Sequence, residues 1–172
     1  AGAVFWSRLY DPDSVQRDTK VKSTLKALDV DAKSVSGHLL FEPWSVETKA
    51  GGFFRVYTPF WRAVSGRMIP EPLAQPRTLC VPTSWPKSER LGDWYMGAGL
   101  QRGQTVLKTY LTAGENAAHD TLHDFIQNGV DRYATGRDLM GVNGTSRLSQ
   151  FLTLGEISSR QVWHVAQRAL LN

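Results

Sequence analysis

Apolar and polar residues along the first 41 positions predict a strand, a helix and a second strand. The apolar run AGAVFWS predicts the first strand, and Asp11 and Pro12 supply the N-cap and the first residue of the helix. Apolar residues then recur at helical spacing up to Asp29, and the run SVSGHLLF predicts the second strand. The strands of such a βαβ unit are parallel, and parallel sheets are normally covered by helices on both faces. This region therefore predicts an incomplete α/β piece.

The middle of the chain is rich in aromatic residues and proline. In the stretch GGFFRVYTPFWRAV, aromatic residues precede Thr58 and Pro59, which predict a helix cap and first turn, so we interpret the stretch as an interface element. Proline lacks a backbone donor and blocks the interior of helices and strands. We therefore expect a linker or a wrapping loop between Gly66 and Gly92, which holds five of the eight prolines: Pro70, Pro72, Pro76, Pro82 and Pro86.

The last third of the chain has the apolar spacing of amphipathic helices. One helix is predicted to end near Gly136, and its stripe at i, i+4, i+7 and i+8 consists of Ala118, Leu122, Phe125 and Ile126. The final helix begins with a capping box formed by Ser158 and Gln161. Ile157 and Val162 occupy the two positions of a hydrophobic staple around that box. The order is thus an α/β piece, a proline-rich connection and an all-helical piece.

Composition narrows the class of protein only a little. The chain has 172 residues, 41% of them hydrophobic, as in an ordinary globular protein. Its net charge of +4 suits a partner rich in phosphate, although a surplus of this size is also common in proteins that bind no nucleic acid. The single Cys80 excludes an internal disulfide. We find neither a membrane-spanning run nor a signal peptide, so we expect a soluble, cytoplasmic protein with no membrane partner.

A cluster of hydroxyl side chains at a predicted helix start is the strongest candidate for chemistry. Thr145, Ser146 and Ser149 surround Arg147, and Gly144 leaves the backbone there open to close approach. A helix N-terminus carries unpaired N–H groups and a partial positive charge, so this cluster could receive a phosphate. Simple helix capping by the same hydroxyls is the alternative.

The remaining candidates are weaker. His119 and His123 lie one helical turn apart, but Asp replaces the general base of the HExxH motif and no third ligand follows, so we expect no metal site. No motif places a Ser or Cys nucleophile beside a histidine. The six tryptophans could transfer electrons or stack on bases, but packing is the commoner role of this residue.

Together the segments resemble the DNA photolyase/cryptochrome family, specifically the class I type of deoxyribodipyrimidine photolyase. Four runs carry the resemblance in family order: WSRLYDPDSVQRD, LLFEPWSV with FRVYTPFWRA, YATGRDLMGVNGTSRLS, and LGEISSRQVW. The resemblance implies that residues 1–48 are the C-terminal part of a Rossmann-like, parallel-sheet antenna domain and that residues 49–112 are the interdomain connection. Residues 113–172 would be the first helices of an all-α FAD-binding domain.

The resemblance also implies roles for individual residues. The TSxLS run embraces the FAD phosphates in similar proteins, so the cofactor-binding positions would be Tyr133, Thr145, Ser146, Arg147, Leu148 and Ser149. Arg137 matches a position that faces the DNA backbone and would contribute affinity without sequence specificity. Asp13 and Ser14 replace the Asn-Glu pair of folate-binding relatives, so a folate antenna is disfavoured, and a deazaflavin, another flavin or no antenna stay open.

By this resemblance the full-length protein is a monomeric, light-driven lyase that splits cyclobutane pyrimidine dimers in damaged DNA by electron transfer from excited, reduced FAD. The electron-transfer residues of the family lie in sequence beyond Asn172, so this chain by itself is expected to be inactive. A cryptochrome-type FAD photoreceptor that signals through a protein partner is the first alternative. A structural fragment without activity of its own is the second.

Overall fold

The structure is a computed structural model that describes residues 2–171. The chain divides into two compact units, each of which is considered by itself. The first contains the N-terminal part up to Glu71 together with the chain from Ile157 onward, and the second is Pro72–Glu156. The first unit is therefore discontinuous in sequence. The domain limits predicted from the sequence, at residues 48 and 112, stay a prediction.

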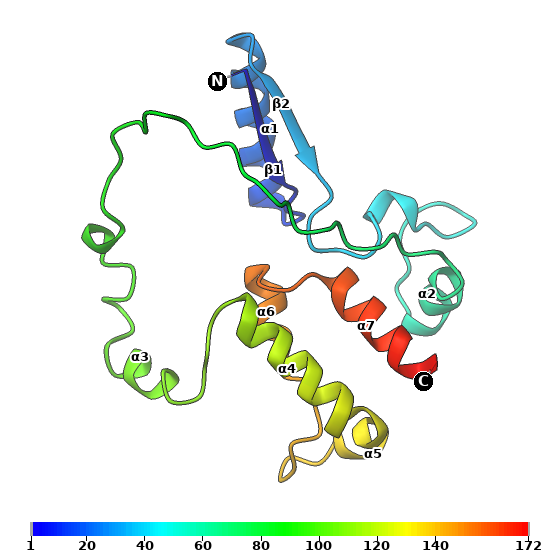
Figure 1. Ribbon diagram of the computed structural model, residues 1–172. Coiled ribbons are helices and arrows are strands. Elements are labelled where there is room, and N and C mark those ends of the chain that lie inside the picture. Colours follow the sequence, from blue (N-terminus) through cyan, green and yellow to red (C-terminus); the bar gives the residue numbers. More distant parts are fainter. Residues whose placement is uncertain (1, 172) are drawn as a thin grey trace. The chain divides into compact units, whose positions relative to one another are not determined.

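A small parallel sheet begins the first unit. Strands β1 (Ala3–Ser7) and β2 (Asp31–Val35) pair in parallel from Ala3↔Asp31 to Ser7↔Val35. Helix α1 (Pro12–Ala27) connects them and lies alongside the sheet (Figure 1). The predicted βαβ order and the parallel pairing are confirmed.

The second strand starts and ends earlier than the sequence predicts. The apolar run SVSGHLLF suggests a strand over residues 34–41, whereas β2 ends at Val35. Pairing stops because β1 ends at Ser7, which leaves later residues without a strand to pair with. Gly37 then passes the backbone of Arg8 so closely that a Cβ atom would lie 2.3 Å from the Arg8 carbonyl oxygen. The apolar run 38–41 is consequently irregular.

Helix α7 (Ser159–Leu171) completes the first unit beside α2 (Tyr57–Val64), as Figure 1 shows. The rings of Trp61 and Trp163 lie 6.4 Å apart, and the Ser159 hydroxyl donates to the His38 carbonyl at 2.8 Å. A short 3-10 turn (Pro43–Ser45) precedes α2. The N-cap of α2 is Val56, so the predicted cap at Thr58 is wrong, because the helix begins at Tyr57, two residues before Pro59.

The capping box of α7 is confirmed. The backbone N–H of Ser158 donates to Gln161 Oε1 at 2.8 Å, and the N–H of Gln161 donates to Ser158 Oγ at 3.1 Å. Ile157 is buried, as a residue of the hydrophobic staple should be. One turn further on, His164 Nε2 lies 3.1 Å from the Ile69 carbonyl oxygen, so α7 also holds the chain just before it leaves the first unit.

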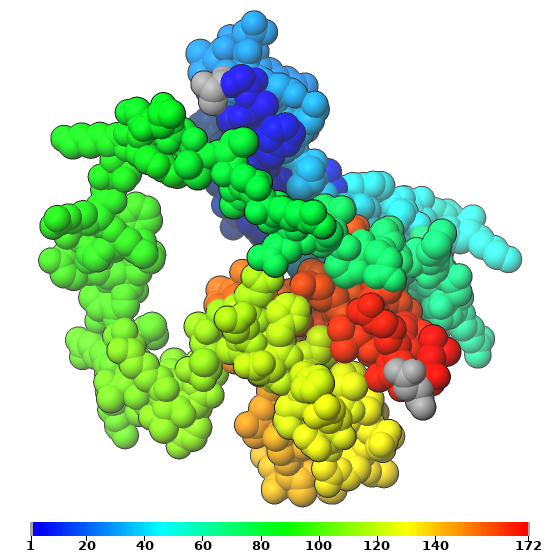
Figure 2. Space-filling model, in the orientation of Figure 1, coloured from blue at the N-terminus to red at the C-terminus, as the bar shows by residue number. Residues whose placement is uncertain are grey.

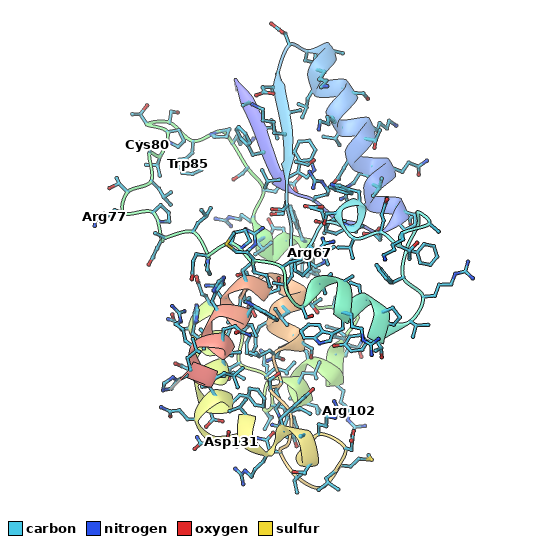
Figure 3. The ribbon with its side chains drawn as sticks, turned by 90° about the vertical axis from the view of Figure 1, so that its right-hand side faces the viewer. Arg67, Arg77, Cys80, Trp85, Arg102 and Asp131 are labelled. Atoms are coloured by element: carbon cyan, nitrogen blue, oxygen red, sulfur yellow. The ribbon has the colours of Figure 1, made fainter. Side chains whose placement is uncertain are left out.

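The second unit starts with the long irregular segment that its prolines predict. Residues 72–90 form neither helix nor strand, and a 3-10 turn (Leu91–Trp94) and helix α3 (Gln101–Leu107) follow. Figure 2 shows the segment in green as a narrow run of chain, and Figure 3 labels Arg77, Cys80 and Trp85 on it. Nearly all of its side chains are exposed, in agreement with a linker or wrapping loop.

The helices of the second unit surround a small core. Helix α4 (Glu115–Asn128) is followed by a 3-10 turn (Val130–Arg132), by α5 (Tyr133–Gly136) and by α6 (Ser149–Leu154). Helix α4 thus ends at Asn128, with Gly129 as its C-cap, earlier than the predicted end near Gly136. Phe125 packs where a side chain at position 129 would lie, 2.7 Å from an added Cβ, so glycine suits this helix end. The buried apolar residues are Ala118, Leu122, Leu148 and Phe151.

None of the described helices has both the length and the apolar character required to cross a bilayer.

Candidate cofactor-binding site

Two glycines allow two backbone segments of the second unit to cross at close range. A Cβ atom added to Gly144 would lie 2.2 Å from the carbonyl oxygen of Gly136, and one added to Gly136 would lie 3.3 Å from the Gly144 Cα atom. Both glycines are buried. We expected Gly144 to leave its backbone open to close approach, and the described structure shows that the Gly136 peptide approaches it closely.

The crossing brings two predicted sets of residues to one place. Tyr133 begins the short helix α5, which ends at Gly136, and Arg137 follows directly. On the other side, Gly144 leads into Thr145 and Ser146. Residues about ten positions apart in sequence therefore become neighbours through a backbone contact that a larger side chain would prevent.

The loop after Gly144 presents hydrogen-bond donors that have no acceptor within the described structure. Arg147 has a φ angle of +53°, in the left-handed region, and Leu148 follows with φ −84° and ψ −8°. Alternation of left-handed and right-handed conformations turns successive N–H groups to the same side and forms an anion-binding nest. The N–H groups from Thr145 to Leu148, and the hydroxyls of Thr145 and Ser146, donate to no other described residue. They are free to bind a ligand.

Helix capping does not explain the hydroxyl cluster. Helix α6 begins at Ser149 with Leu148 as its N-cap, and no side chain makes a cap hydrogen bond there. Thr145 and Ser146 instead lie ahead of the helix in the loop. The capping alternative is therefore wrong for these residues, and the helix has only six residues with which to build a dipole.

A shallow cavity of about 160 Å³ lies between this loop and the C-terminal half of α4. Ligand pockets that enclose a drug-sized molecule have volumes of about 300 to 1,000 Å³, so this cavity could hold only part of a larger ligand. Arg132 and Arg147 contribute two positive charges, against one carboxylate from Asp124 that accepts a hydrogen bond from Asn128 at 2.8 Å. The lining residues are Thr121, Asp124, Phe125, Asn128, Gly129, Arg132, Asn143, Thr145, Ser146 and Arg147.

The structure separates the predicted site residues into three groups. Thr145, Ser146 and Arg147 share the cavity. The ring of Tyr133 packs edge-on against Phe125, with centroids 5.9 Å apart, and the Arg137 guanidinium lies 5.8 Å from the centre of the Tyr133 ring. The Leu148 side chain is buried in the core, so only its backbone is available to a ligand, whereas Ser149 is exposed at the first position of α6.

Several residues of the cavity were missed in the sequence. Asp124 and Asn128 lie one turn apart on the polar face of α4, and Arg132 follows in the next turn and donates to the Asn128 carbonyl. The i, i+4 spacing of these three polar residues was the available signal. This spacing alone could not identify a binding site, because exposed polar faces are typical of most amphipathic helices.

The other candidates make ordinary contacts. His119 lies 3.8 Å from Glu115 on the same helix face, and the described residues contain no group of three His, Cys, Asp or Glu side chains that could hold a metal ion. The Trp6 indole N–H donates to Asp18 at 3.0 Å. In the first unit, a larger hollow of about 510 Å³ is lined mainly by apolar and aromatic side chains, including Phe41, Phe60 and Trp163.

Residue patterns predicted the parallel βαβ unit and the irregular proline-rich connection, and the family resemblance predicted a phosphate-binding role for the hydroxyl cluster after Gly144. Residues 1–77 match the DNA photolyase family. The chain is also similar over 97% of its length to deoxyribodipyrimidine photo-lyase of Agrobacterium fabrum, at 40% identity, and to Cryptochrome-2 of Arabidopsis thaliana, at 30% identity. Nearly the whole chain is therefore similar both to a photolyase and to a cryptochrome of the DNA photolyase/cryptochrome family.

Solved structures agree on the fold. A class III photolyase from Agrobacterium tumefaciens superposes on 95% of the chain with a TM-score of 0.85 and 40% identity. An archaeal photolyase from Sulfolobus tokodaii, at 22% identity and a TM-score of 0.63, shares the fold. These comparisons support the family but not the class I subgroup that we expected, since the relative at 40% identity is of class III. The chain spans about a third of the length of these relatives.

Proposed function

We propose that this chain is part of a light-driven, FAD-dependent DNA repair lyase of the class III photolyase type, which splits cyclobutane pyrimidine dimers. The observation that carries the proposal is the loop after Gly144. Its unpaired N–H and hydroxyl donors stand at the positions where the family resemblance expects the FAD phosphates. Identity of 40% to a photolyase over 97% of the chain supports the same function.

The residues present fit the phosphate part of such a cofactor. Thr145 and Ser146 would donate their hydroxyls, the nest at Arg147 and Leu148 would donate backbone N–H groups, and Ser149 would stand at the edge of this anion site. Tyr133 would lie beside the same ligand, held by its contact with Phe125. When bound, reduced FAD would supply the electron that cleaves the dimer after excitation.

Arg137 would bind the DNA backbone. Its side chain is exposed, and its only ion pair with a described residue is a long contact of 3.6 Å to the neighbouring Asp138. A guanidinium that is so weakly engaged is free to bind a phosphate. Such a contact adds affinity that is independent of base sequence, as a repair enzyme that must work on any sequence requires.

A cryptochrome-type photoreceptor is the second candidate. The similarity to Cryptochrome-2 also extends over 97% of the chain, and the loop described above would hold FAD in either protein. An assay for light-driven cleavage of pyrimidine dimers by the protein that carries this chain would decide between a photolyase and a cryptochrome. We further propose that this protein is monomeric and cytoplasmic. We also propose that any antenna chromophore is not folate, because Asp13 and Ser14 replace the Asn-Glu pair of folate-binding relatives.

The assignment of roles can be tested with two variants of the protein that carries this chain. Thr145→Ala should purify with less flavin, since it loses a hydroxyl contact with a net value of about 1 kcal/mol, and should keep its DNA affinity. Arg137→Ala should keep its flavin but bind all DNA sequences more weakly, with a salt slope reduced by about 1. Flavin absorbance relative to protein and salt-dependent DNA titrations measure the two effects.

Matched controls are available within the second unit. Thr112→Ala and Arg102→Ala change exposed residues away from the loop and should alter neither quantity. If Arg137→Ala loses flavin while Thr145→Ala keeps it and binds DNA poorly, the assignment of roles is wrong, although the similarity to the photolyases is unaffected.

A further inference from the structure

The crossing of Gly136 and Gly144 involves one particular peptide group. A Cβ atom at position 144 would lie 2.2 Å from the Gly136 oxygen, 2.3 Å from its carbonyl carbon and 2.9 Å from the Arg137 nitrogen. All three atoms belong to the peptide bond that joins Gly136 to Arg137. Gly144 therefore packs directly on the peptide that leads into Arg137.

This peptide is held on both of its polar groups. The Arg137 N–H donates to the Tyr133 carbonyl at 3.1 Å, and the Gly136 carbonyl accepts from the Leu139 N–H at 3.0 Å. A side chain at position 144 would have to displace a backbone group that is engaged in two hydrogen bonds. Because Arg137 is the next residue, its side chain would move with the displaced peptide.

The other side of the crossing leads into the loop that carries the donors. Thr145 follows Gly144 directly, so the same contact limits where its hydroxyl can lie. A single backbone contact thus sets the relative position of a cofactor-facing hydroxyl and a DNA-facing guanidinium. Both of those roles rest on the proposed function.

We propose that Gly144 is a positioning residue for Arg137: it fixes the Gly136–Arg137 peptide so that the guanidinium meets a DNA backbone phosphate. The contact requires that position 144 has no side chain. Gly144 does not itself touch the DNA. Its effect on DNA binding passes through Arg137.

Three glycine variants should disturb the crossing of Gly136 and Gly144 to increasing extents. Gly141→Ala is the control, because no atom lies within 4 Å of its added Cβ and its φ angle is not in the left-handed region. Gly136→Ala should have a small effect, since its nearest neighbour is the Gly144 Cα atom at 3.3 Å and a slight shift relieves the contact. Gly144→Ala should have the largest effect, since it meets backbone atoms below 3.0 Å. The Gly136 variant keeps the proposal testable if Gly144→Ala does not fold.

A double-mutant cycle in the protein that carries this chain separates positioning from simple stabilisation. In the wild-type background, Arg137→Ala should weaken binding to undamaged DNA by roughly tenfold through the loss of one charge-assisted contact. In the Gly144→Ala background the same change should weaken binding less than about twofold, because Arg137 is already displaced. If the tenfold effect persists in folded Gly144→Ala protein, the proposal is wrong.

Amide hydrogen exchange gives a second measurement that needs no DNA. The Arg137 and Leu139 amides should exchange faster in Gly144→Ala and, to a smaller extent, in Gly136→Ala, but not in Gly141→Ala. If exchange changes as expected while Arg137→Ala has no effect on DNA binding in either background, the DNA role in the proposed function is wrong and the backbone contact stands. Unchanged exchange at both amides would overturn the positioning role itself.

Discussion

At the scale of single residues, Asp11 is the predicted N-cap of α1, and its capping contact lowers the pKa of its carboxyl. Its side chain accepts a hydrogen bond from the Ser14 N–H at 2.9 Å at the start of α1. This bond, together with the side chain of Ser14, holds the pKa of the Asp11 carboxyl below its ordinary value of 3.8. The charged form is therefore the one that the folded state favours.

The stability of α1 should depend on pH through this carboxylate. A folded-state pKa below the unfolded value means that the stabilising contribution is present above pH 3.8 and is lost as the pH falls through the lower folded value. Asp11→Ala should lower the melting temperature at pH 7, and its difference from wild type should shrink below pH 3.8. Asp11→Asn caps without titrating and serves as control. A difference that stays constant down to pH 2, measured by circular dichroism, would contradict this.

At the scale of elements, α7 depends on contacts at its own start. The reciprocal hydrogen bonds of Ser158 and Gln161 satisfy two backbone donors at the beginning of this helix. Next to them, Ser159 bonds the His38 carbonyl, and Trp163 packs near Trp61. The cap therefore supports the helix that completes the first unit.

Removal of the cap should destabilise the first unit measurably. We expect Ser158→Ala to cost about 1 kcal/mol in free energy of unfolding, because the N–H of Gln161 loses its acceptor. Gln161→Ala should cost a similar amount, and the double variant less than the sum, since the two bonds form together. Gln167→Ala on the exposed face of α7 is the control. Urea unfolding measures these four variants against wild type, and fully additive costs would argue against the capping box as one unit.

At the scale of the whole molecule, the cavity is small compared with the proposed cofactor. Its volume of about 160 Å³ accommodates a phosphate group but not a complete dinucleotide. The chain covers 35% of the length of the photolyase from Agrobacterium fabrum. Many contacts of FAD would thus have to come from sequence outside this chain.

The isolated 172-residue chain should consequently bind FAD weakly. A few hydroxyl and N–H contacts are too few to offset the loss of ligand freedom and the ordering of the loop. Titration of FAD against the purified chain, followed by flavin fluorescence, should show no stoichiometric binding at submicromolar concentration. Tight binding at a ratio of one to one would mean that the loop of Thr145 to Ser149 is sufficient by itself.

Local patterns were enough to predict several parts of this protein. The caps at Asp11 and Ser158, the parallel βαβ unit and the irregular proline-rich segment depend on residues close together in sequence, so short-range rules describe them. The hydroxyl cluster was also noticed from its composition, and the resemblance to the photolyase family from four short runs. In each case, residues close together in sequence determine the local structure or carry the motif.

Other features were decided only by the tertiary structure. The strand β2 ends where its partner β1 ends, and α7 joins the first unit although 85 residues of the second unit precede it. The sequence predicted that the backbone of Gly144 is open to close approach, but only the structure identified the approaching group as the Gly136 peptide. The sequence by itself determined which residues can cap, turn or donate hydrogen bonds. Tertiary structure decided which of them meet, because contacts between distant segments depend on the path of the whole chain.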